Sequence, residues 1–286
     1  MTSKAFCPGH ITGFFSIPIE RKKAMNKVGS KGAGFSIALG ATAEAEVEGN
    51  GWDITVNGEK TSFLVVEKTL FNLAPGGKVE LSTDIPFSQG FGMSGACALA
   101  AGTAVLGELG EKDSDKALNA AHESEIFCRT GLGDVIGQYN GGFETRVKGG
   151  LPPHGEIKVE ERDDDVVIGI IGSPFSTPDI LNDAIMSAWI KAIGDDMMEE
   201  FMPEDGFDRF LDLSLQFAEE TKFIKDEMQP IINKCSEYGK GSMAMIGNSI
   251  FFFGDTDKLE EVMVEELRED NVYVTKIDPK GARLIS

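Results

Sequence analysis

Residues 84–106, DIPFSQGFGMSGACALAAGTAVL, decide how the rest of the chain is interpreted. Residues 78–84 alternate apolar and polar side chains, which predicts a half-buried strand, and the Ala- and Leu-rich residues 96–109 predict a buried helix. A glycine-rich turn that leads into a helix leaves backbone N–H groups without partners at the positive end of the helix dipole, where a phosphate binds well. The alternative is a tight turn that needs glycine only for its backbone conformation.

The turn also carries a hydroxyl, that of Ser94, which can bind the Mg²⁺ that accompanies a phosphate. No lysine follows the glycines, so the common phosphate loop GxxxxGK[ST] is excluded. Glycine-rich turns are weak motifs, and these residues alone support phosphate binding and a purely structural turn about equally.

The spacing P-x-x-x-G-[aromatic/Leu]-G-x-S-x-A between Pro86 and Ala96 resembles the second motif of the GHMP kinases (galacto-, homoserine, mevalonate and phosphomevalonate kinases). In that family the loop wraps the phosphates of ATP, and the second serine of a Gly-Ser-Ser helps to hold Mg²⁺. The resemblance implies ATP and Mg²⁺ as ligands, with Ser94 on the metal and Met93 in place of the first serine. The nucleotide-binding residues that it implies are Pro86, Gly90, Gly92, Met93, Ser94, Gly95 and Ala96.

Composition and charge narrow the class of protein. The chain has 286 residues, 41% of them hydrophobic, and no apolar run long enough to span a bilayer. Four cysteines without CxxC spacing indicate neither a zinc site nor a disulfide framework, so a reducing, cytoplasmic location is expected. The net charge is −20, of which residues 1–150 carry −3 and residues 151–286 carry −17. With this charge, the chain has no broad basic surface that could bind nucleic acid or an anionic membrane. We expect a small-molecule substrate instead. The sequence leaves a homodimer open.

The first fourteen residues after Ser3, KAFCPGHITGFFSI, predict a strand that turns at Pro8 and Gly9. The segment resembles the first motif of the family, typically Ala-Pro-Gly-Lys before a strand, and His10 stands where many members have lysine. We therefore expect His10 either to contact the substrate or to serve as a turn residue. Residues 28–35, VGSKGAGF, predict a glycine-rich loop in which Ser30 and backbone donors form a nest for a carboxylate; a loop without a ligand is the alternative.

Residues 112–127 repeat apolar positions at helical intervals, and His122 and Glu125 share one face of the predicted helix. The helix leads into CRTGLGDV and a Gly-Gly pair, a pattern that resembles the segment carrying the catalytic aspartate of the GHMP kinases, here Asp134. A carboxylate there orients the acceptor hydroxyl and takes its proton. With Ser94, Glu125 is the expected Mg²⁺ ligand and Glu123 the alternate; solvated surface glutamates are the competing interpretation.

Arg146, on a strand predicted after the Gly-Gly turn, would lie close to Asp134. A planar guanidinium suits a carboxylate on the substrate, although a surface arginine fits the pattern as well. His122 is a second candidate donor to the same substrate, or else a hydrogen-bonded core histidine.

Residues 151–155, LPPHG, are the best linker, which divides the chain into an ATP-binding and catalytic domain, 1–150, and a C-terminal domain, 151–286. The resemblance implies an α+β GHMP kinase fold, with a ribosomal protein S5 domain 2-like N-terminal domain and a ferredoxin-like C-terminal domain. Residues 241–253 lie where the family has its third motif, but without its Gly-Ala-Gly they are better explained as a buried pair of strands.

Taken together, CPGHITGFF, GSKGAGFS, IPFSQGFGMSGACAL and CRTGLGDV resemble an archaeal branch of the family. That branch transfers phosphate from ATP to a small hydroxy acid on the route to coenzyme A. An anionic hydroxy acid needs donors beside the catalytic loop, which Ser30, His122 and Arg146 could provide. The alternatives are a kinase for mevalonate, phosphomevalonate or homoserine, and a non-catalytic sensor that binds ATP or another ligand.

Overall fold

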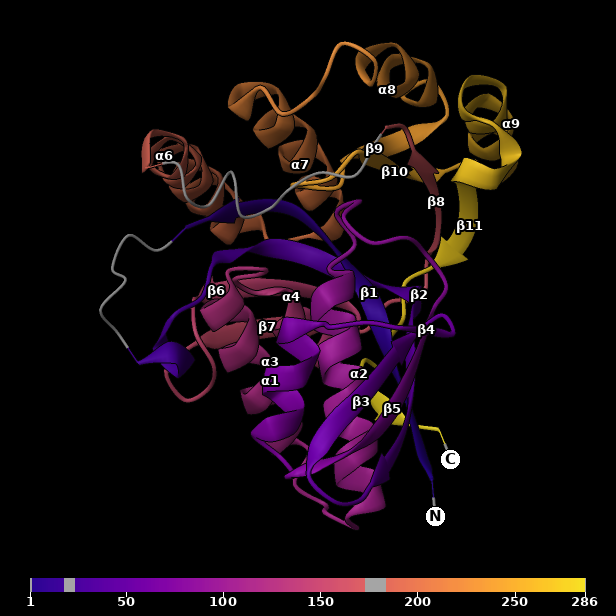
Figure 1. Cartoon of the computed structure of the whole chain (residues 1–286). Helices are drawn as coiled ribbons and strands as arrows, with labels where there is room; N and C mark the ends of the chain where they lie inside the picture. The colour runs from indigo at the N-terminus through magenta and orange to yellow at the C-terminus, as the bar shows by residue number, and fades with distance from the viewer. Residues whose placement is uncertain (1, 18–23, 173–183, 286) are drawn as a thin grey trace.

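A computed structural model of the chain describes residues 2–17, 24–172 and 184–285. Helices and strands are mixed along the sequence, and the strands form two separate sheets, as Figure 1 shows, so the predicted α+β class is confirmed. The first sheet lies in the lower part of that view and has the order β12-β1-β2-β5-β3-β4, with β6 and β7 attached through β2. Its strands are β1 (Ser3–Ser16), β2 (Lys31–Val47), β3 (Gly51–Val56), β4 (Glu59–Lys60), β5 (Gly76–Thr83), β6 (Phe143–Lys148), β7 (Glu156–Glu160) and β12 (Arg283–Leu284).

The long strands β1 and β2 pair antiparallel along most of their length. The turn predicted at Pro8 and Gly9 is wrong. β1 continues through a β-bulge there, because β2 pairs with it both before Pro8 and after Gly9. The glycine-rich loop predicted at residues 28–35 is also wrong from Lys31 onward, where β2 begins and bonds to both β1 and β6. Asn57 and Gly58, both at positive φ, form the hairpin turn between β3 and β4.

Helices of the first half cover one face of this sheet, and α2 is the central one (Figure 1). The predicted strand and helix on either side of the glycine turn are confirmed as β5 and α2. Twelve of the sixteen residues of α2 are buried, and most of them are alanine or glycine, which lets the helix lie close to β1 and β2. The helices are α1 (Leu64–Phe71), α2 (Met93–Glu108), α3 (Asp115–Cys128) and α4 (Asp134–Asn140), with a 3₁₀ turn, η1 (Met25–Lys27), near α3.

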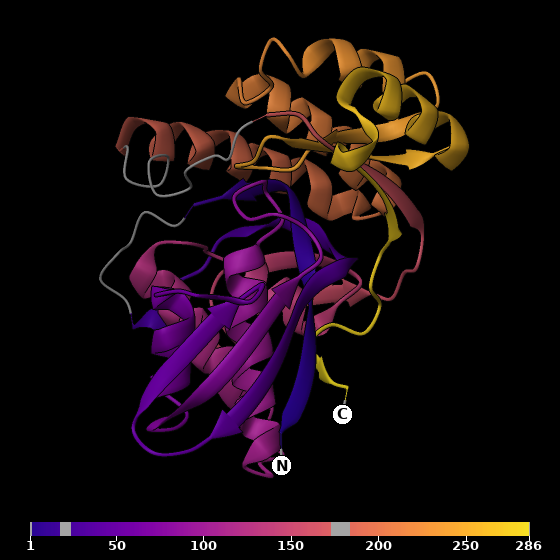
Figure 2. The ribbon, with the colours of Figure 1, turned by 45° about the vertical axis from the view of Figure 1, so that its right-hand side comes forward.

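The second sheet has the order β11-β8-β10-β9 and lies with its helices above the first in Figure 2. It pairs residues 239–243 with 249–254, which confirms the buried pair of strands predicted there. Its elements are β8 (Asp165–Ile170), β9 (Gly239–Met243), β10 (Ser249–Gly254), β11 (Val272–Lys276), α6 (Ala184–Phe201), η2 (Met202–Glu204), α7 (Phe207–Thr221), α8 (Gln229–Cys235), α9 (Thr256–Leu267) and η3 (Glu269–Asn271).

Aromatic rings join the two halves into one core. Phe35 of β2 packs edge-on against Phe251 and Phe253 of β10, with ring centroids 5.2 and 5.1 Å apart, and Phe143 of β6 packs on Phe210 of α7 at 4.9 Å. Such contacts hold β10 against β2 and α7 against β6. In the part of the chain that the structure describes, no helix is long and apolar enough to cross a membrane.

β7 extends the first sheet past residue 150, and β12 returns the end of the chain to it. The strands therefore change sheet between residues 160 and 165. The boundary predicted between residues 150 and 151 stays a prediction.

Candidate active site

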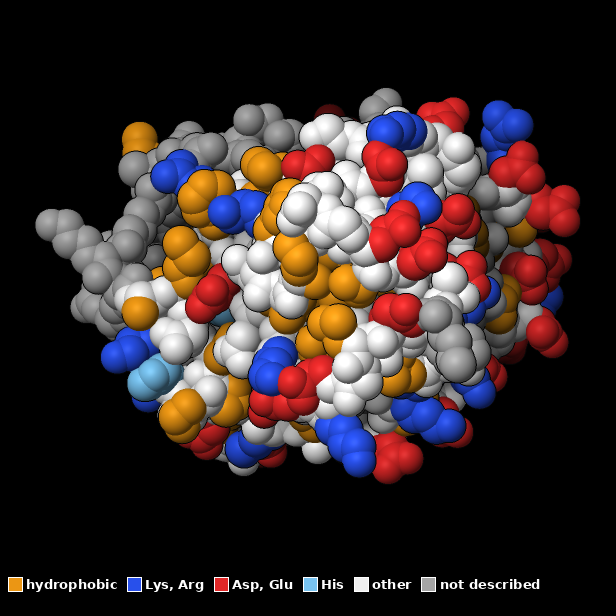
Figure 3. All heavy atoms as spheres, turned by 60° about the horizontal axis from the view of Figure 1, so that its bottom comes forward, with side chains coloured by type: hydrophobic (Ala, Val, Ile, Leu, Met, Phe, Trp, Pro, Cys, Tyr) orange, Lys and Arg blue, Asp and Glu red, His pale blue; other side chains and the backbone are white. Residues whose placement is uncertain are grey.

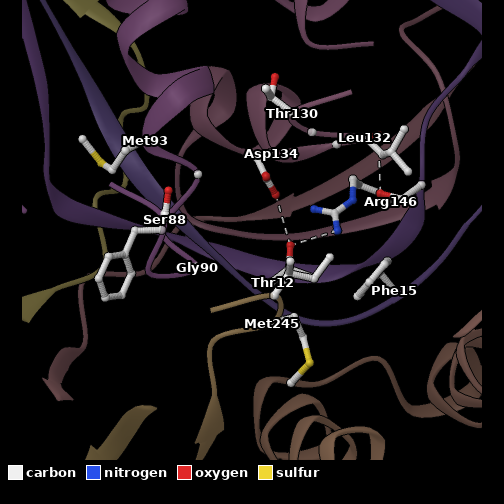
Figure 4. Close-up of a pocket in the computed structure, with 16 residues that line it drawn as sticks. Thr12, Phe15, Ser88, Gly90, Met93, Thr130, Leu132, Asp134, Arg146 and Met245 are labelled. Atoms are coloured by element: carbon white, nitrogen blue, oxygen red, sulfur yellow. Dashed lines mark hydrogen bonds between the residues drawn. The ribbon is translucent and has the colours of Figure 1, made fainter. Parts of the chain in front are cut away.

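A cavity of about 100 Å³ lies where the start of α2, the loop between α3 and α4, and strands β1 and β6 meet the turn between β9 and β10. We call it the site cavity. Figure 4 shows Asp134, Thr12 and Arg146 pointing toward one another inside it. Its lining residues are Thr12, Phe15, Ser30, Ser88, Gly90, Phe91, Gly92, Met93, Thr130, Gly131, Leu132, Gly133, Asp134, Arg146, Met245 and Ile246.

The glycine turn at the start of α2 is shaped to receive an anion. Gly92 adopts the left-handed conformation (φ 59°) before the helix, and no side chain caps the first N–H groups of α2. Those donors are therefore left for a ligand. A Cβ on Gly92 would lie 3.0 Å from Gln138 Nε2 and 3.2 Å from the Cβ of Asp134, so glycine is needed for the backbone to approach the aspartate this closely. Phosphate groups fit these donors.

Ser94 and Glu125 are brought together as predicted. Ser94 Oγ donates to Glu125 Oε1 at 2.8 Å, and Thr130 Oγ1 donates to the same oxygen at 3.1 Å. Burial, together with the nearby charge of Asp134, raises the pKa of Glu125 to about 8, although the two hydroxyls oppose this. A buried carboxylate beside a serine hydroxyl fits a cation brought in with a phosphate.

Glu123, the alternate ligand, lines a different hollow on the outer side of α3, with Asn119 and Leu109. Among the described residues no group of three His, Cys, Asp or Glu side chains could hold a metal alone. Mg²⁺ commonly takes only one or two protein oxygens and completes its shell with phosphate and water. The geometry therefore favours Glu125 over Glu123, and both assignments stay predictions.

Asp134 is the first residue of α4 and reaches the site cavity with 28% of its side chain exposed. Its Oδ1 accepts from Thr12 Oγ1 at 3.3 Å and lies 3.2 Å from His10 Nδ1. Burial raises the pKa of Asp134, but the hydrogen bond and charge of His10, with the charge of Arg146, outweigh it and leave this pKa below its usual value. Asp134 is thus held ionised, ready to accept a hydrogen bond from a hydroxyl.

Behind Asp134 lies a chain of buried charged groups that the sequence did not reveal. His10 is only 1% exposed, and its Nε2 lies 2.9 Å from Glu144 Oε1, while Nη1 of Arg146 donates to the same oxygen. Burial alone would lower the pKa of His10, but Glu144 and Asp134 reverse this and raise it to about 9. The imidazole lies in a slot that only glycine permits, since a Cβ on Gly34 or Gly137 would come within 2.8 Å of the ring.

Arg146 is 2% exposed and is not a surface residue. Its Nη2 donates to Thr12 Oγ1 at 3.3 Å, while its buried Nε has no partner among the described residues. A Cβ on Gly133 would lie 2.8 Å from that Nε and 2.6 Å from Ser30 Oγ. Ser30 and Arg146 therefore present polar groups to the same point above Gly133, which fits an anionic ligand.

Other predicted residues lie outside the site cavity. His122 Nε2 bonds to the carbonyl of Val28 at 2.9 Å, and burial lowers its pKa, so it is a neutral donor that supports the segment before Ser30. His10 lies behind Asp134, and Pro86, Gly95 and Ala96 do not line the cavity; Ser94 and Glu125, paired with each other, do not line it either. Direct ligand contacts by all of these residues stay predictions.

Thr12, Thr130, Glu144, Met245 and Ile246 were missed. Thr130 directly precedes the G-x-G-D pattern and follows Glu125 by five residues, so its closeness in sequence to both could have suggested a place in the site. The others come from segments far apart in sequence: Met245 N donates to the carbonyl of Thr12, and Ser249 Oγ donates to the carbonyl of Gln89, which seats the β9–β10 turn on the glycine turn.

Known proteins resemble this chain in sequence and in fold. Residues 60–142 match the family described as GHMP kinases N terminal domain. The chain is 35% identical to the pantoate kinase of Methanocaldococcus jannaschii, covering 90% of this chain and 95% of that one, and 31% identical to the pantoate kinase of Thermococcus kodakarensis, covering 88% and 87%. A solved structure described as a phosphotransferase related to the CoA biosynthesis pathway superposes with a TM-score of 0.87 at 27% identity, over 99% of this chain and 98% of that one. The fold is that of the GHMP kinases, and the chain belongs to the pantoate kinase family.

Proposed function

We propose that this protein is an ATP-dependent pantoate kinase, which transfers the γ-phosphoryl group of ATP to the 4-hydroxyl of (R)-pantoate and gives 4-phosphopantoate and ADP for archaeal coenzyme A synthesis. The relatives named above carry this activity in their descriptions. The observation that carries the proposal is that an uncapped helix start, an ionised aspartate and a buried arginine with an unused donor face one cavity. A cytoplasmic location and a homodimer remain predictions.

Each group has a role that follows from its position. The N–H groups at the start of α2 bind the phosphates of ATP, and Asp134 orients the 4-hydroxyl and accepts its proton as the phosphoryl group leaves ATP. Ser94 and Glu125 would hold Mg²⁺, which when bound neutralises phosphate charge. Arg146 Nε and Ser30 Oγ bind the substrate carboxylate.

An ADP-release assay over a panel of small alcohols tests the proposal. Pantoate should give the highest kcat/KM, well above mevalonate, phosphomevalonate and homoserine. Higher turnover with one of those alcohols would reassign the substrate. ATP binding without ADP release for any acceptor would instead indicate a sensor on the same fold.

Arg146→Lys is expected to raise the KM for pantoate about tenfold or more, with little change in the KM for ATP. Lysine keeps the charge opposite Glu144 but cannot present a planar donor pair to a carboxylate. Arg146→Ala is less informative, because it would also leave Glu144 buried without its cation. Steady-state kinetics with each substrate varied in turn gives both KM values, and an unchanged pantoate KM would remove Arg146 from the substrate site.

In Ser94→Ala, the gain in nucleotide affinity that Mg²⁺ provides is expected to be about tenfold smaller, while the affinity without metal changes little. The reason is that alanine removes the hydroxyl paired with Glu125 and leaves the N–H groups of α2 in place. Titration calorimetry with a non-hydrolysable ATP analogue, at several Mg²⁺ concentrations, measures this. Ser62→Ala is a suitable control, because Ser62 lies before α1 and its hydroxyl, within the described part of the chain, bonds only to Glu67.

A further inference from the structure

We propose that a second, lysine-lined hollow beside the site cavity binds a small phosphate-bearing polyanion that is distinct from the ATP of the proposed reaction. This hollow, the lysine recess, has a volume of about 300 Å³. That volume is at the lower end of the range for ligand pockets. Its lining residues are Ser16, Ile17, Lys27, Gly29, Lys31, Lys148, Gly149, His154 and Lys191.

The concentration of positive charge is unusual for this chain, which has 27 basic and 47 acidic residues. Four lysines reach the recess from η1, the start of β2, the end of β6, and α6. Figure 3 shows one face of the molecule on which acidic side chains crowd the right-hand side, while the left-hand side has few of them and carries several basic side chains and a histidine. Like charges held together raise the free energy of the folded chain unless an anion compensates them.

One carboxylate accounts for only part of this charge. Lys31 and Lys191 both pair with Asp195, which also accepts from Ser16 Oγ at 2.7 Å. Burial opposes ionisation of Asp195, but these three donors outweigh it and lower its pKa to about 2. Lys27 and Lys148 form no ion pair and no side-chain hydrogen bond with any residue in the described ranges. The recess therefore keeps two unpaired ammonium groups beside a cluster of two lysines and one carboxylate, which is itself still positive.

The walls of the recess are fixed by backbone packing. Gly149 lies against Gly29 so closely that a Cβ on Gly149 would come within 2.0 Å of the Gly29 carbonyl oxygen. The same segment is held from its other side by His122, which bonds to the carbonyl of Val28. The lysines thus project from a braced backbone, and an anion bound between them meets a preformed site.

The recess shares three chain segments with the site cavity but none of its lining residues. Phe15, Ser30 and Arg146 line the site cavity, while their near neighbours Ser16, Lys31 and Lys148 line the recess. No residue of the glycine turn at the start of α2 reaches the recess. An anion there is therefore separate from the triphosphate and contacts the segments that carry the proposed substrate-binding groups. Several ammonium groups in a small volume suit the clustered charge of phosphate groups.

Titration calorimetry with inorganic pyrophosphate on the full chain tests the inference. A saturating non-hydrolysable ATP analogue is present, so that the glycine turn is already occupied. We expect one pyrophosphate to bind the unaltered protein, and the double variant Lys27→Gln/Lys148→Gln to weaken binding by at least about tenfold. The matched control Lys112→Gln/Lys280→Gln removes the same charge at two exposed lysines that make no ion pair with a described residue, and it should bind like the unaltered protein.

Three results would overturn the inference: no pyrophosphate binding once the analogue is present, equal weakening in both double variants, or citrate binding as tightly as pyrophosphate. The last would assign the recess to carboxylates. The thermal unfolding midpoint of each variant is measured alongside, and neither should fall, because the recess variant removes like charges and the control variant removes exposed ones. ADP release with pantoate is a separate readout, so failure of the recess and failure of the proposed function are distinguishable.

Discussion

Asp134→Asn is expected to lower kcat by about 10²- to 10⁴-fold while the affinity for an ATP analogue changes by less than about twofold. Asparagine has nearly the same shape and can still accept from Thr12, so the hydroxyl side of the cavity keeps its geometry. What is lost is a negative charge that can take the proton of the acceptor hydroxyl. In the proposed mechanism the start of α2 binds the phosphates, so nucleotide binding should not depend on that charge.

Single-turnover ADP release and calorimetry with the analogue give the two quantities for the Asp134 variant. Asp53→Asn is a suitable control, since Asp53 is an exposed residue of β3 that pairs with Lys60 far from the site cavity. Near-normal turnover of Asp134→Asn would show that another group orients the hydroxyl. A parallel loss of analogue binding would instead show that the substitution disturbs the glycine turn.

Local signals predicted the parts of the site that are contiguous in sequence. The strand, glycine turn and helix around Gly92 were read from alternation and composition, and Asp134 from its motif, because each depends on a few neighbouring residues. The bulge at Pro8 was predicted as a turn, since Pro-Gly favours turns locally while the long pairing with β2 acts from thirty residues away. Tertiary pairing overrode the local preference.

The charged groups behind the site could not be predicted for the same reason. Glu144 and Arg146 alternate with Thr145 in β6 as if on a half-exposed strand, yet all three are buried. Glu144 and Arg146 face His10 and Thr12 of β1, while the opposite face of β6 packs on α7 through Phe143. The pairing of Glu144 with His10 joins residues 134 positions apart. Only the glycines gave a signal: Gly34 and Gly137 are the residues that leave room for the imidazole ring, but the sequence alone does not show what they make room for.

His10 is the residue whose substitution should separate structural support from chemistry. Its ring lies between Asp134 and Glu144, and with a pKa of about 9 it is an imidazolium at neutral pH. Because this pKa is raised, the stability that it contributes is complete below about pH 6.5 and is lost as pH rises through about 9. The pKa of Asp134 is lowered, so its contribution is present above its usual value and is lost as pH falls through the lowered pKa.

His10→Gln is therefore expected to lower kcat at pH 7 by about tenfold or more and to move the acid limb of the kcat profile to higher pH. The limb moves because His10 is the main group that keeps the pKa of Asp134 low, and a neutral amide cannot replace its charge. His10→Lys restores a cation between Asp134 and Glu144 and should return the limb toward its original pH even if kcat stays reduced.

The measurement is kcat from about pH 3 to 9.5 for the three proteins, so that the range includes the acid limb set by the lowered pKa of Asp134, with the free energy of unfolding taken at each pH. A purely structural histidine would lower kcat by the same factor at every pH, because misplacing Asp134 does not alter when it ionises. An unshifted acid limb in His10→Gln would thus confine His10 to packing in its glycine-lined slot. A limb that shifts in His10→Gln and returns in His10→Lys would instead show that Asp134 needs a positive charge beside it. Lysine and glutamine fill the slot about equally, and they differ mainly in that lysine is charged.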